Sequence, residues 1–344
     1  MNKKVIVFGG GTGLSYLLRG LKQYPLDITA VVSVCDDGGS TGKLRDEFDI
    51  LAPGDIRRVI EALSDNENEL SKLLNYRFES KGDLNNHSLG NLILLAEMKI
   101  QGSTQKAIEN LGKILKLKGK VLQFTEDKVT LICEMEDNTI IEGEHNITKS
   151  PKKIKKVFYK EEPTINEELI EEIKEADLIL LSMGSLFTSI IPNLLSQDIK
   201  TAIDESKAKI VYCCNLFTQP GETDDYKVSD HIKTLNSYLG NRNVDYVIAN
   251  NGEIDKTLAD IYANEEQKDI VILDKKETEK LGAKVITDDL VYIKLFTAEQ
   301  KNVFRHNYVK LGFIINTIAL GYAYMLNAKK KWGINEIIIR TSCW

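Results

Sequence analysis

Short apolar runs alternate with amphipathic stretches along most of the chain. Leucines recur at intervals of three and four from residue 14 to residue 21, which places them on one face of a helix. Continuous apolar runs are typical of strands in a parallel sheet that helices cover on both faces. The pattern therefore predicts an α/β fold with a mostly parallel sheet. The strands are expected at residues 5–8, 28–35, 177–182, 209–214 and 245–249, and further helices at 55–63, 69–78, 88–98 and 166–176.

The middle of the chain has a different pattern. Residues 120–124, 128–134 and 139–144 are short runs of β-forming residues, and 136–138 supplies a turn between the last two. We expect a small antiparallel β insertion at about residues 119–160. The basic run at 149–156 closes it, and such a run is typical of solvated surface, with contact to an anionic partner as the alternative.

Residues 311–325 are mostly apolar, but glycine, asparagine and threonine interrupt them. A bilayer span needs roughly 18 or more apolar residues, so we expect no membrane span here. A buried terminal helix or a contact in a homo-oligomer explains the segment better. The predicted organisation is an α/β domain over 1–312 that contains the insertion, followed by a helical extension over 313–344.

Composition narrows the class of protein. The 344 residues carry a net charge of −6, which argues against nucleic acid as the main partner. The apolar run near the N-terminus is too short for a secretory signal. The five cysteines include no pair spaced as Cys-x-x-Cys, so structural zinc and a disulfide framework are disfavoured. We expect a protein of the reducing cytoplasm.

A glycine-rich turn follows the first predicted strand. Gly9, Gly10, Gly11 and Gly13 surround Thr12, and a helix begins directly afterwards. Without Cβ atoms, backbone N–H groups can close on an oxyanion, and the start of the helix adds partial positive charge. The turn matches neither the dinucleotide fingerprint nor the Walker A loop. We expect a phosphorylated ligand here, with a tight turn that binds nothing as the alternative.

The second strand ends in an acidic turn. Asp36 and Asp37 stand beside Gly38 and Ser40. The two carboxylates could accept hydrogen bonds from a ribose, hold Mg²⁺ against a diphosphate, or only satisfy N–H groups of the turn. All three interpretations remain open at the level of sequence.

Further polar residues cluster at predicted helix starts and strand ends. Arg57 could clamp a phosphate or form a surface ion pair, and His87 could be structural or functional. Loops at residues 183–189, 215–223 and 250–252 follow buried strands, and in an open parallel sheet such loops meet at one edge, where ligands bind. Glu222 is a candidate base or ribose ligand. No spacing identifies a nucleophile or a Ser-His-Asp arrangement.

Six of these motifs occur in an order that resembles a known family. They lie at residues 9–15, 36–42, 53–57, 87–91, 184–193 and 215–223. Together they are similar to the YvcK-type gluconeogenesis-factor family, a branch of the CofD-like superfamily. The resemblance covers roughly residues 4–311 and implies a three-layer α/β/α Rossmann-like fold. It also implies a cytoplasmic protein that binds a nucleotide sugar such as UDP-N-acetylglucosamine and supports cell shape and envelope synthesis during gluconeogenic growth.

The superfamily also contains 2-phospho-L-lactate transferases, which use a guanosine diphosphate-linked donor and Mg²⁺. The chain departs from their Pro-Asp-x-Asp pattern at residues 53–57. It departs from its own branch at Met183 and Ile261, where proline and arginine are expected, and at Asn307, which replaces an aspartate. We therefore predict a nucleotide-sugar-binding protein, with an Mg²⁺-dependent transferase as the alternative.

The predicted site follows from the motifs and the resemblance together. For a transferase, the candidate catalytic residues are Asp36, Asp37 and His87, with Mg²⁺ held by the two aspartates. The predicted ligand-binding residues are Gly9, Gly10, Gly11, Thr12, Gly13, Asp36, Asp37, Gly38, Ser40, Asp55, Arg57, His87, Ser88, Asn91, Gly184, Ser185, Thr188, Ser189, Asn215, Thr218 and Glu222.

Overall fold

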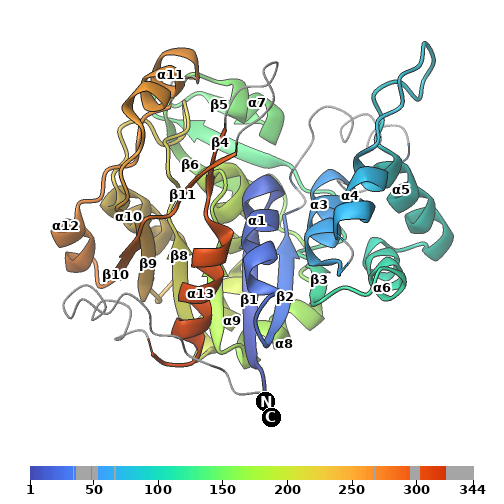
Figure 1. Cartoon of the computed structure of the whole chain (residues 1–344), viewed down its shortest axis with the longest axis horizontal. Coiled ribbons are helices and arrows are strands. Elements are labelled where there is room, and N and C mark those ends of the chain that lie inside the picture. Colours follow the sequence, from blue (N-terminus) through green and yellow to red (C-terminus); the bar gives the residue numbers. More distant parts are fainter. Residues whose placement is uncertain are drawn as a thin grey trace.

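A seven-stranded sheet forms the centre of the molecule (Figure 1), and every pair of neighbouring strands in it is parallel. The computed structural model describes residues 1–33, 35, 48, 53–65, 67–266, 268–294 and 303–322. The strand order is β10-β9-β8-β7-β1-β2-β3. The strands are β1 (Lys3–Gly9), β2 (Leu26–Val32), β3 (Lys120–Gln123), β7 (Leu178–Leu181), β8 (Lys209–Cys213), β9 (Tyr246–Asn250) and β10 (Lys284–Asp288).

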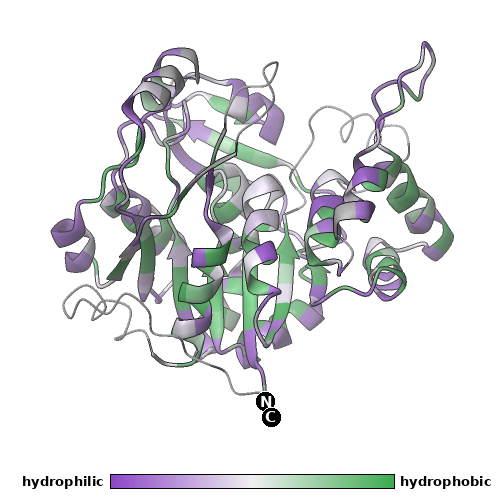
Figure 2. Cartoon of the chain, in the orientation of Figure 1, coloured by the Kyte–Doolittle hydropathy of each residue, from purple (hydrophilic) through white to green (hydrophobic). Residues whose placement is uncertain are grey.

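Helices cover both faces of the sheet, so the fold is a three-layer α/β/α sandwich, as predicted. Apolar side chains of one face pack against α1 (Gly11–Leu21), α3 (Pro53–Leu63), α5 (Leu89–Gln101), α6 (Thr104–Ile114) and α13 (Tyr308–Ala319). The other face packs against α8 (Glu167–Glu175), α9 (Gln197–Glu205) and α10 (Val228–Tyr238). Figure 2 shows the hydrophobic residues concentrated along the central strands, because burial on both faces favours apolar side chains.

The order of strands places a topological switch point between β1 and β7. From β1 the chain continues through β2 to β3 on one side, whereas β7, β8, β9 and β10 follow one another on the other side. At such a point the loops after the two central strands diverge and leave a crevice at their carboxyl ends. The glycine-rich turn after β1 and the loop after β7 therefore face each other.

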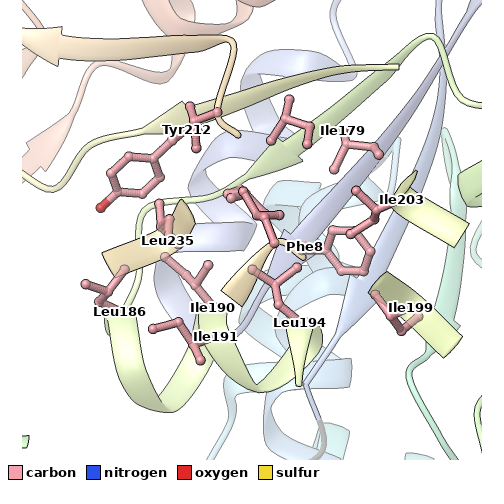
Figure 3. Close-up of a cluster of buried hydrophobic side chains, with 14 of the residues drawn as sticks. Phe8, Ile179, Leu186, Ile190, Ile191, Leu194, Ile199, Ile203, Tyr212 and Leu235 are labelled. Carbon is pink, nitrogen blue, oxygen red and sulfur yellow. The ribbon is translucent and has the colours of Figure 1, made fainter. Parts of the chain in front are cut away.

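The loop after β7 is anchored by its own apolar residues. It contains a π-helical turn (Leu186–Ile190) and a 3₁₀ turn (Ile191–Leu194). Leu186, Ile190 and Leu194 are fully buried in the core beneath the sheet. Figure 3 shows these side chains gathered near Phe8 of β1. This packing fixes the backbone that precedes the turn, including Gly184.

The β insertion is smaller than the sequence predicted. It consists of β4 (Leu131–Met135), β5 (Ile140–Glu142) and β6 (Ile154–Tyr159), all antiparallel, with the short helix α7 (Glu144–Lys149). The assignment of residues 120–124 to it was wrong, because β3 pairs in parallel with β2 at the edge of the main sheet. The sequence of a four-residue strand does not indicate whether it will pair in parallel or antiparallel. The neighbouring strand in the folded protein decides which sheet it joins.

The basic run at 149–156 contributes to this insertion. Lys155 and Lys156 of β6 form ion pairs with Glu134 of β4, with N–O distances of 2.7 and 2.9 Å. Lys152 and Lys153 pair with Asp137 and Asp225. These lysines are therefore solvated surface residues held by neighbouring carboxylates.

The last described helix, α13, packs against α1. A Cβ atom added at Gly20 would lie 2.1 Å from the Tyr308 carbonyl oxygen, so the two helices approach backbone to backbone. The domain boundary expected at 312 falls inside α13, and residues 323–344 lie outside the described part of the chain.

None of the helices in the described ranges is long and apolar enough to cross a membrane. The hairpin of β11 (Val291–Lys294) and β12 (Val303–His306) precedes α13.

Candidate functional site

A cavity of about 250 Å³ opens at the topological switch point. Its walls come from the turn after β1, the loops after β7 and β8, the end of α11 (Lys256–Glu266), and β12. Segments from the beginning, middle and end of the chain thus meet around one space. The lining residues are Thr12, Gly13, Tyr16, Met183, Gly184, Asn215, Leu216, Phe217, Thr218, Gln219, Tyr262, Lys268, Phe304, Arg305 and His306.

Two glycines of the first turn permit close contact with the loop after β7. A Cβ atom at Gly13 would lie 1.3 Å from the Met183 carbonyl oxygen, and one at Gly9 would lie 2.0 Å from Oγ of Ser182. No larger residue fits at Gly13 without moving the backbone. These two glycines hence serve the packing of loop against loop, which forms the floor of the cavity.

A third glycine of the turn binds a carboxylate of the protein itself. The N–H of Gly11 donates to Oδ2 of Asp55, at 2.6 Å, and Oδ1 of Asp55 accepts a 3.3 Å bond from Arg58. Gly11 has a φ of +56°, the left-handed region that favours glycine. Asp55 thus occupies the first N–H of α1, where a phosphate was one predicted occupant.

The far wall of the cavity combines aromatic rings with cationic side chains. The rings of Phe217, Tyr262 and Phe304 lie 4.9 to 5.2 Å apart, and the Tyr262 hydroxyl accepts a bond from the Phe304 N–H. Arg305 and Lys268 supply two positive charges to the same cavity. The wall therefore offers flat apolar surface beside donors for an anion.

His306 lines the cavity as a neutral side chain. Its Nε2 lies 2.9 Å from the Cys214 carbonyl oxygen at the end of β8. Burial lowers the pKa of His306 to about 4. A neutral ring donates from Nε2 to that carbonyl, which leaves Nδ1 as an acceptor. The contact also ties β12 to the carboxyl end of β8.

Glu222 lies beneath the cavity and is only 4% exposed. Its carboxylate accepts hydrogen bonds from the Ser185 hydroxyl, the Phe187 N–H and Nε2 of Gln219. Burial raises the pKa of Glu222 to about 7, and these bonds oppose the rise. Glu222 thus joins the loops after β7 and β8 through three donors.

Arg57 belongs to a buried network away from the lining residues. Its Nε donates to Oδ1 of Asn91 at 3.0 Å, and its guanidinium lies 3.6 Å from Glu61. Asn75 donates to the same Glu61 carboxylate at 2.7 Å. Arg57 is only 5% exposed. The network joins α3 to α4 (Glu67–Asn75) and α5.

The motif at 87–91 begins α5. Ser88 is its N-cap and accepts a 3.3 Å bond from the Asn91 N–H. The backbone of His87 accepts a bond from Phe78 in the segment between α4 and α5, which projects from the body of the molecule (Figure 1). Neither His87 nor Ser88 lines the cavity.

The structure brings some of the predicted ligand-binding residues together at the cavity: Thr12, Gly13, Gly184, Asn215 and Thr218. Gly9, Gly10, Gly11, Ser185, Ser189 and Glu222 lie in or against the adjoining loops, whereas Asp55, Arg57, His87, Ser88 and Asn91 belong to the α3 and α5 side. Thr188 bonds to Ser185 in the loop after β7. That these residues bind a ligand stays a prediction.

The acidic turn lies outside the described residues. Asp36, Asp37, Gly38 and Ser40 are all in this part of the chain, so the proposed Mg²⁺ ligands have no described geometry. Within the described ranges there is no group of three or more His, Cys, Asp or Glu side chains that could hold a metal ion. We assign no step to a metal.

The predicted site omitted several lining residues. Tyr16 follows the glycine turn by one helical turn, and Phe217 and Gln219 stand inside a motif that the sequence already identified. Phe304, Arg305 and His306 lie almost 300 residues from the first turn, so spacing gives no signal that they approach it. Only the family resemblance, through the motif that ends at Asn307, could have indicated them.

Comparison with known proteins defines the class. The model of the family described as 2-phospho-L-lactate transferase CofD matches residues 5–291, and the chain belongs to this family. Among curated relatives, it is 44% identical to the gluconeogenesis factor of Halalkalibacterium halodurans over 311 residues, which cover 90% of this chain and 94% of that one. It is also 44% identical to the gluconeogenesis factor of Bacillus subtilis, over 91% of this chain and 96% of that protein.

A crystal structure shows the same fold. A UPF0052-family protein from Bacillus halodurans superimposes with a TM-score of 0.85 at 45% identity, over 91% of this chain and 99% of that chain. A second crystal structure of that protein gives a TM-score of 0.86 at 44% identity, over 93% and 100% of the two chains. These relatives confirm both the predicted fold and the predicted family branch.

Proposed function

We propose that this chain is a cytoplasmic binding protein for a nucleotide sugar of the UDP-N-acetylglucosamine type. In this proposal it acts as a gluconeogenesis factor that supports cell shape and envelope synthesis. The observation that carries it is the composition of one cavity: Arg305 and Lys268 stand beside the aromatic wall and the start of α1. A nucleotide sugar carries a flat base, which matches the aromatic wall, and a diphosphate, which matches the two cations. Its hydroxyl groups match the polar groups at the start of α1.

The cations provide the main attraction in this proposal. Each charge-assisted hydrogen bond to a phosphate contributes about 1.5–3 kcal/mol, more than a neutral one. Thr12 and Gly13 add polar groups at the N-terminus of α1, which is the positive end of the helix dipole. Because the Gly11 N–H already donates to Asp55, the ligand contacts the turn at Thr12 and Gly13.

The alternative is a transferase that acts on a nucleotide diphosphate-linked donor with Mg²⁺. The family match favours this alternative, because the family description names 2-phospho-L-lactate transferase. Its candidate catalytic residues are Asp36, Asp37 and His87. His87 lies outside the cavity lining, which favours binding over turnover.

Calorimetric titration with UDP-N-acetylglucosamine, UDP, GDP and NAD tests the proposal. We expect the UDP sugar to bind most tightly and to be recovered unchanged after long incubation with Mg²⁺. Consumption of a GDP-linked donor in the presence of Mg²⁺ would establish the transferase instead. Preference for NAD, or no binding of any of the four, would refute the proposed function.

A further inference from the structure

Glu222 is a buried carboxylate within reach of the cavity but not part of its lining. Its Oε1 accepts a 2.6 Å bond from Nε2 of Gln219, and Gln219 lines the cavity. Its Oε2 accepts bonds from Ser185 and from the N–H of Phe187, at 3.3 Å for the latter. Gly184, directly before Ser185, also lines the cavity. A single side chain thus separates this carboxylate from the proposed ligand.

The neighbours of Glu222 stabilise its charge by hydrogen bonds alone. The loop after β7 supplies only hydroxyl and N–H donors, and the loop after β8 supplies an amide. Cys133 of β4 faces it with a thiol whose pKa burial raises to about 12, so this thiol stays neutral. The backbone of Lys152 lies near Gly221, but the side chains of Lys152 and Lys153 pair with Asp137 and Asp225. None of the described lysines and arginines forms an ion pair with Glu222.

Protonation changes the direction of hydrogen bonds here rather than removing them. The Ser185 Oγ lies 2.6 Å from Oγ1 of Thr188 as well as beside Glu222. With an ionised carboxylate the hydroxyl hydrogen points to Glu222. With a protonated one, Glu222 donates to Ser185, which in turn donates to Thr188. The loop therefore has a complete set of bonds in both states.

A dianionic diphosphate in the cavity would repel the ionised form of Glu222. Glu222 is buried, and charges inside a protein are screened far less than charges in water. We propose that Glu222 is a positioning residue that holds Gln219 and Ser185 and takes up a proton from solvent when an anionic ligand enters the cavity. The inference rests on the proposed function, because it requires an anion at that place.

The pH range follows from the burial of the carboxyl group. Since burial raises the pKa of Glu222 to about 7, the free protein changes charge near neutral pH. His306, the imidazole in the cavity wall, has a pKa lowered to about 4 and stays neutral there. The affinity for the anionic ligand is then constant below pH 7, where Glu222 is already protonated. Above pH 7 this affinity falls by up to tenfold per pH unit.

Calorimetry of UDP-N-acetylglucosamine binding from pH 6 to 8.5 tests the inference, with each pH measured in two buffers of different ionisation enthalpy. The sugar nucleotide is a suitable probe because its diphosphate diester does not titrate in this range. We expect the wild-type protein to take up a fraction of one proton, most strongly above pH 7. Glu222→Gln should bind with no proton uptake and with a dissociation constant independent of pH.

A second variant guards against a folding defect in Glu222→Gln. Ser185→Ala removes one bond that favours the ionised form, so the pH of maximal proton uptake should move upward. Proton uptake that persists in Glu222→Gln, or wild-type binding without uptake at any pH, would overturn the inference while leaving the proposed function standing. No binding by the wild-type protein would refute the proposed function, and the inference would fall with it.

Discussion

Gly11 donates its backbone N–H to Oδ2 of Asp55 across 2.6 Å, so the first turn of α1 holds a carboxylate of the same chain. The glycine-rich turn is thereby divided in two. Gly11 faces Asp55 of α3, whereas Thr12 and Gly13 face the cavity. A turn that looked like a single phosphate grip in the sequence has one part that joins α1 to α3 and another that is open to a ligand.

Removing the carboxylate at Asp55 should destabilise the protein. Asp55→Ala leaves the Gly11 N–H without this acceptor and Arg58 without its partner, at a cost of about 1–3 kcal/mol. Asp55→Asn keeps an oxygen for Gly11 and should cost about half as much. Urea denaturation of both variants measures the difference. Equal stability of Asp55→Ala and the wild-type protein would show that the Gly11 contact contributes nothing.

Gly13→Ala should destabilise the protein, because the new methyl group would meet the Met183 carbonyl at 1.3 Å and force the two loops apart. We expect a loss of about 2 kcal/mol or more, typical of an overpacked site. Gly184→Ala is the matched control on the same cavity, since its nearest neighbour would lie at an ordinary 3.5 Å. Thermal and urea unfolding should separate the two variants. Similar stabilities would argue against the loop contact.

Arg305→Gln should weaken binding of UDP-N-acetylglucosamine by about 10-fold or more, because a charge-assisted bond to phosphate is lost. The matched control is Arg77→Gln, an exposed arginine in the segment between α4 and α5 that donates to the Asn86 carbonyl oxygen. Calorimetry should show the control binding like the wild-type protein. Equal loss in both variants would indicate a general charge effect rather than a contact in the cavity.

Arg57→Ala should lower stability and leave the affinity of the folded protein unchanged. Truncation removes one of the two guanidinium groups beside the buried Glu61 carboxylate and leaves Arg19, at 3.5 Å, as its partner. The Arg57 hydrogen bonds are lost as well, so we expect a cost of about 1–3 kcal/mol. Arg58→Ala, whose side chain is 44% exposed, should cost less than about 1 kcal/mol. Urea denaturation and calorimetry together make this test. Lost affinity with unchanged stability would instead support the interpretation that Arg57 clamps a phosphate.

The pH dependence of stability should carry the signature of Glu222. Between pH 4.5, the ordinary pKa, and about 7, the folded protein holds a proton that the unfolded chain has released. Stability therefore falls as pH rises through this window, by at most about 1.4 kcal/mol per unit, and the loss is complete above pH 7.

Glu222→Gln removes this term, so the free energy of unfolding of the variant minus that of the wild-type protein should rise between pH 4.5 and 7 and then level off. Glu69→Gln, on the exposed surface of α4, provides the control for the loss of a carboxylate. Parallel urea titrations at several pH values measure both curves. A flat difference for Glu222→Gln would mean that the buried carboxyl group titrates as an exposed one does.

The sequence by itself determined the class of fold. Continuous apolar runs such as 178–181 are typical of strands in a covered parallel sheet, and the leucines of α1 define their helix face locally. The order of six motifs likewise determined the family, which the comparisons confirm. These features depend on neighbouring residues, so they are visible along the chain.

Only the tertiary structure decided which residues share the cavity and which serve the core. Arg57 and Thr12 are both candidate phosphate ligands in the sequence, yet one is enclosed in a network with Glu61 and the other lines the cavity. Arg305 reaches the first turn because β12 and α13 return the chain to α1. Burial and long-range approach depend on how distant segments pack together, and a local pattern of residues carries no record of that packing.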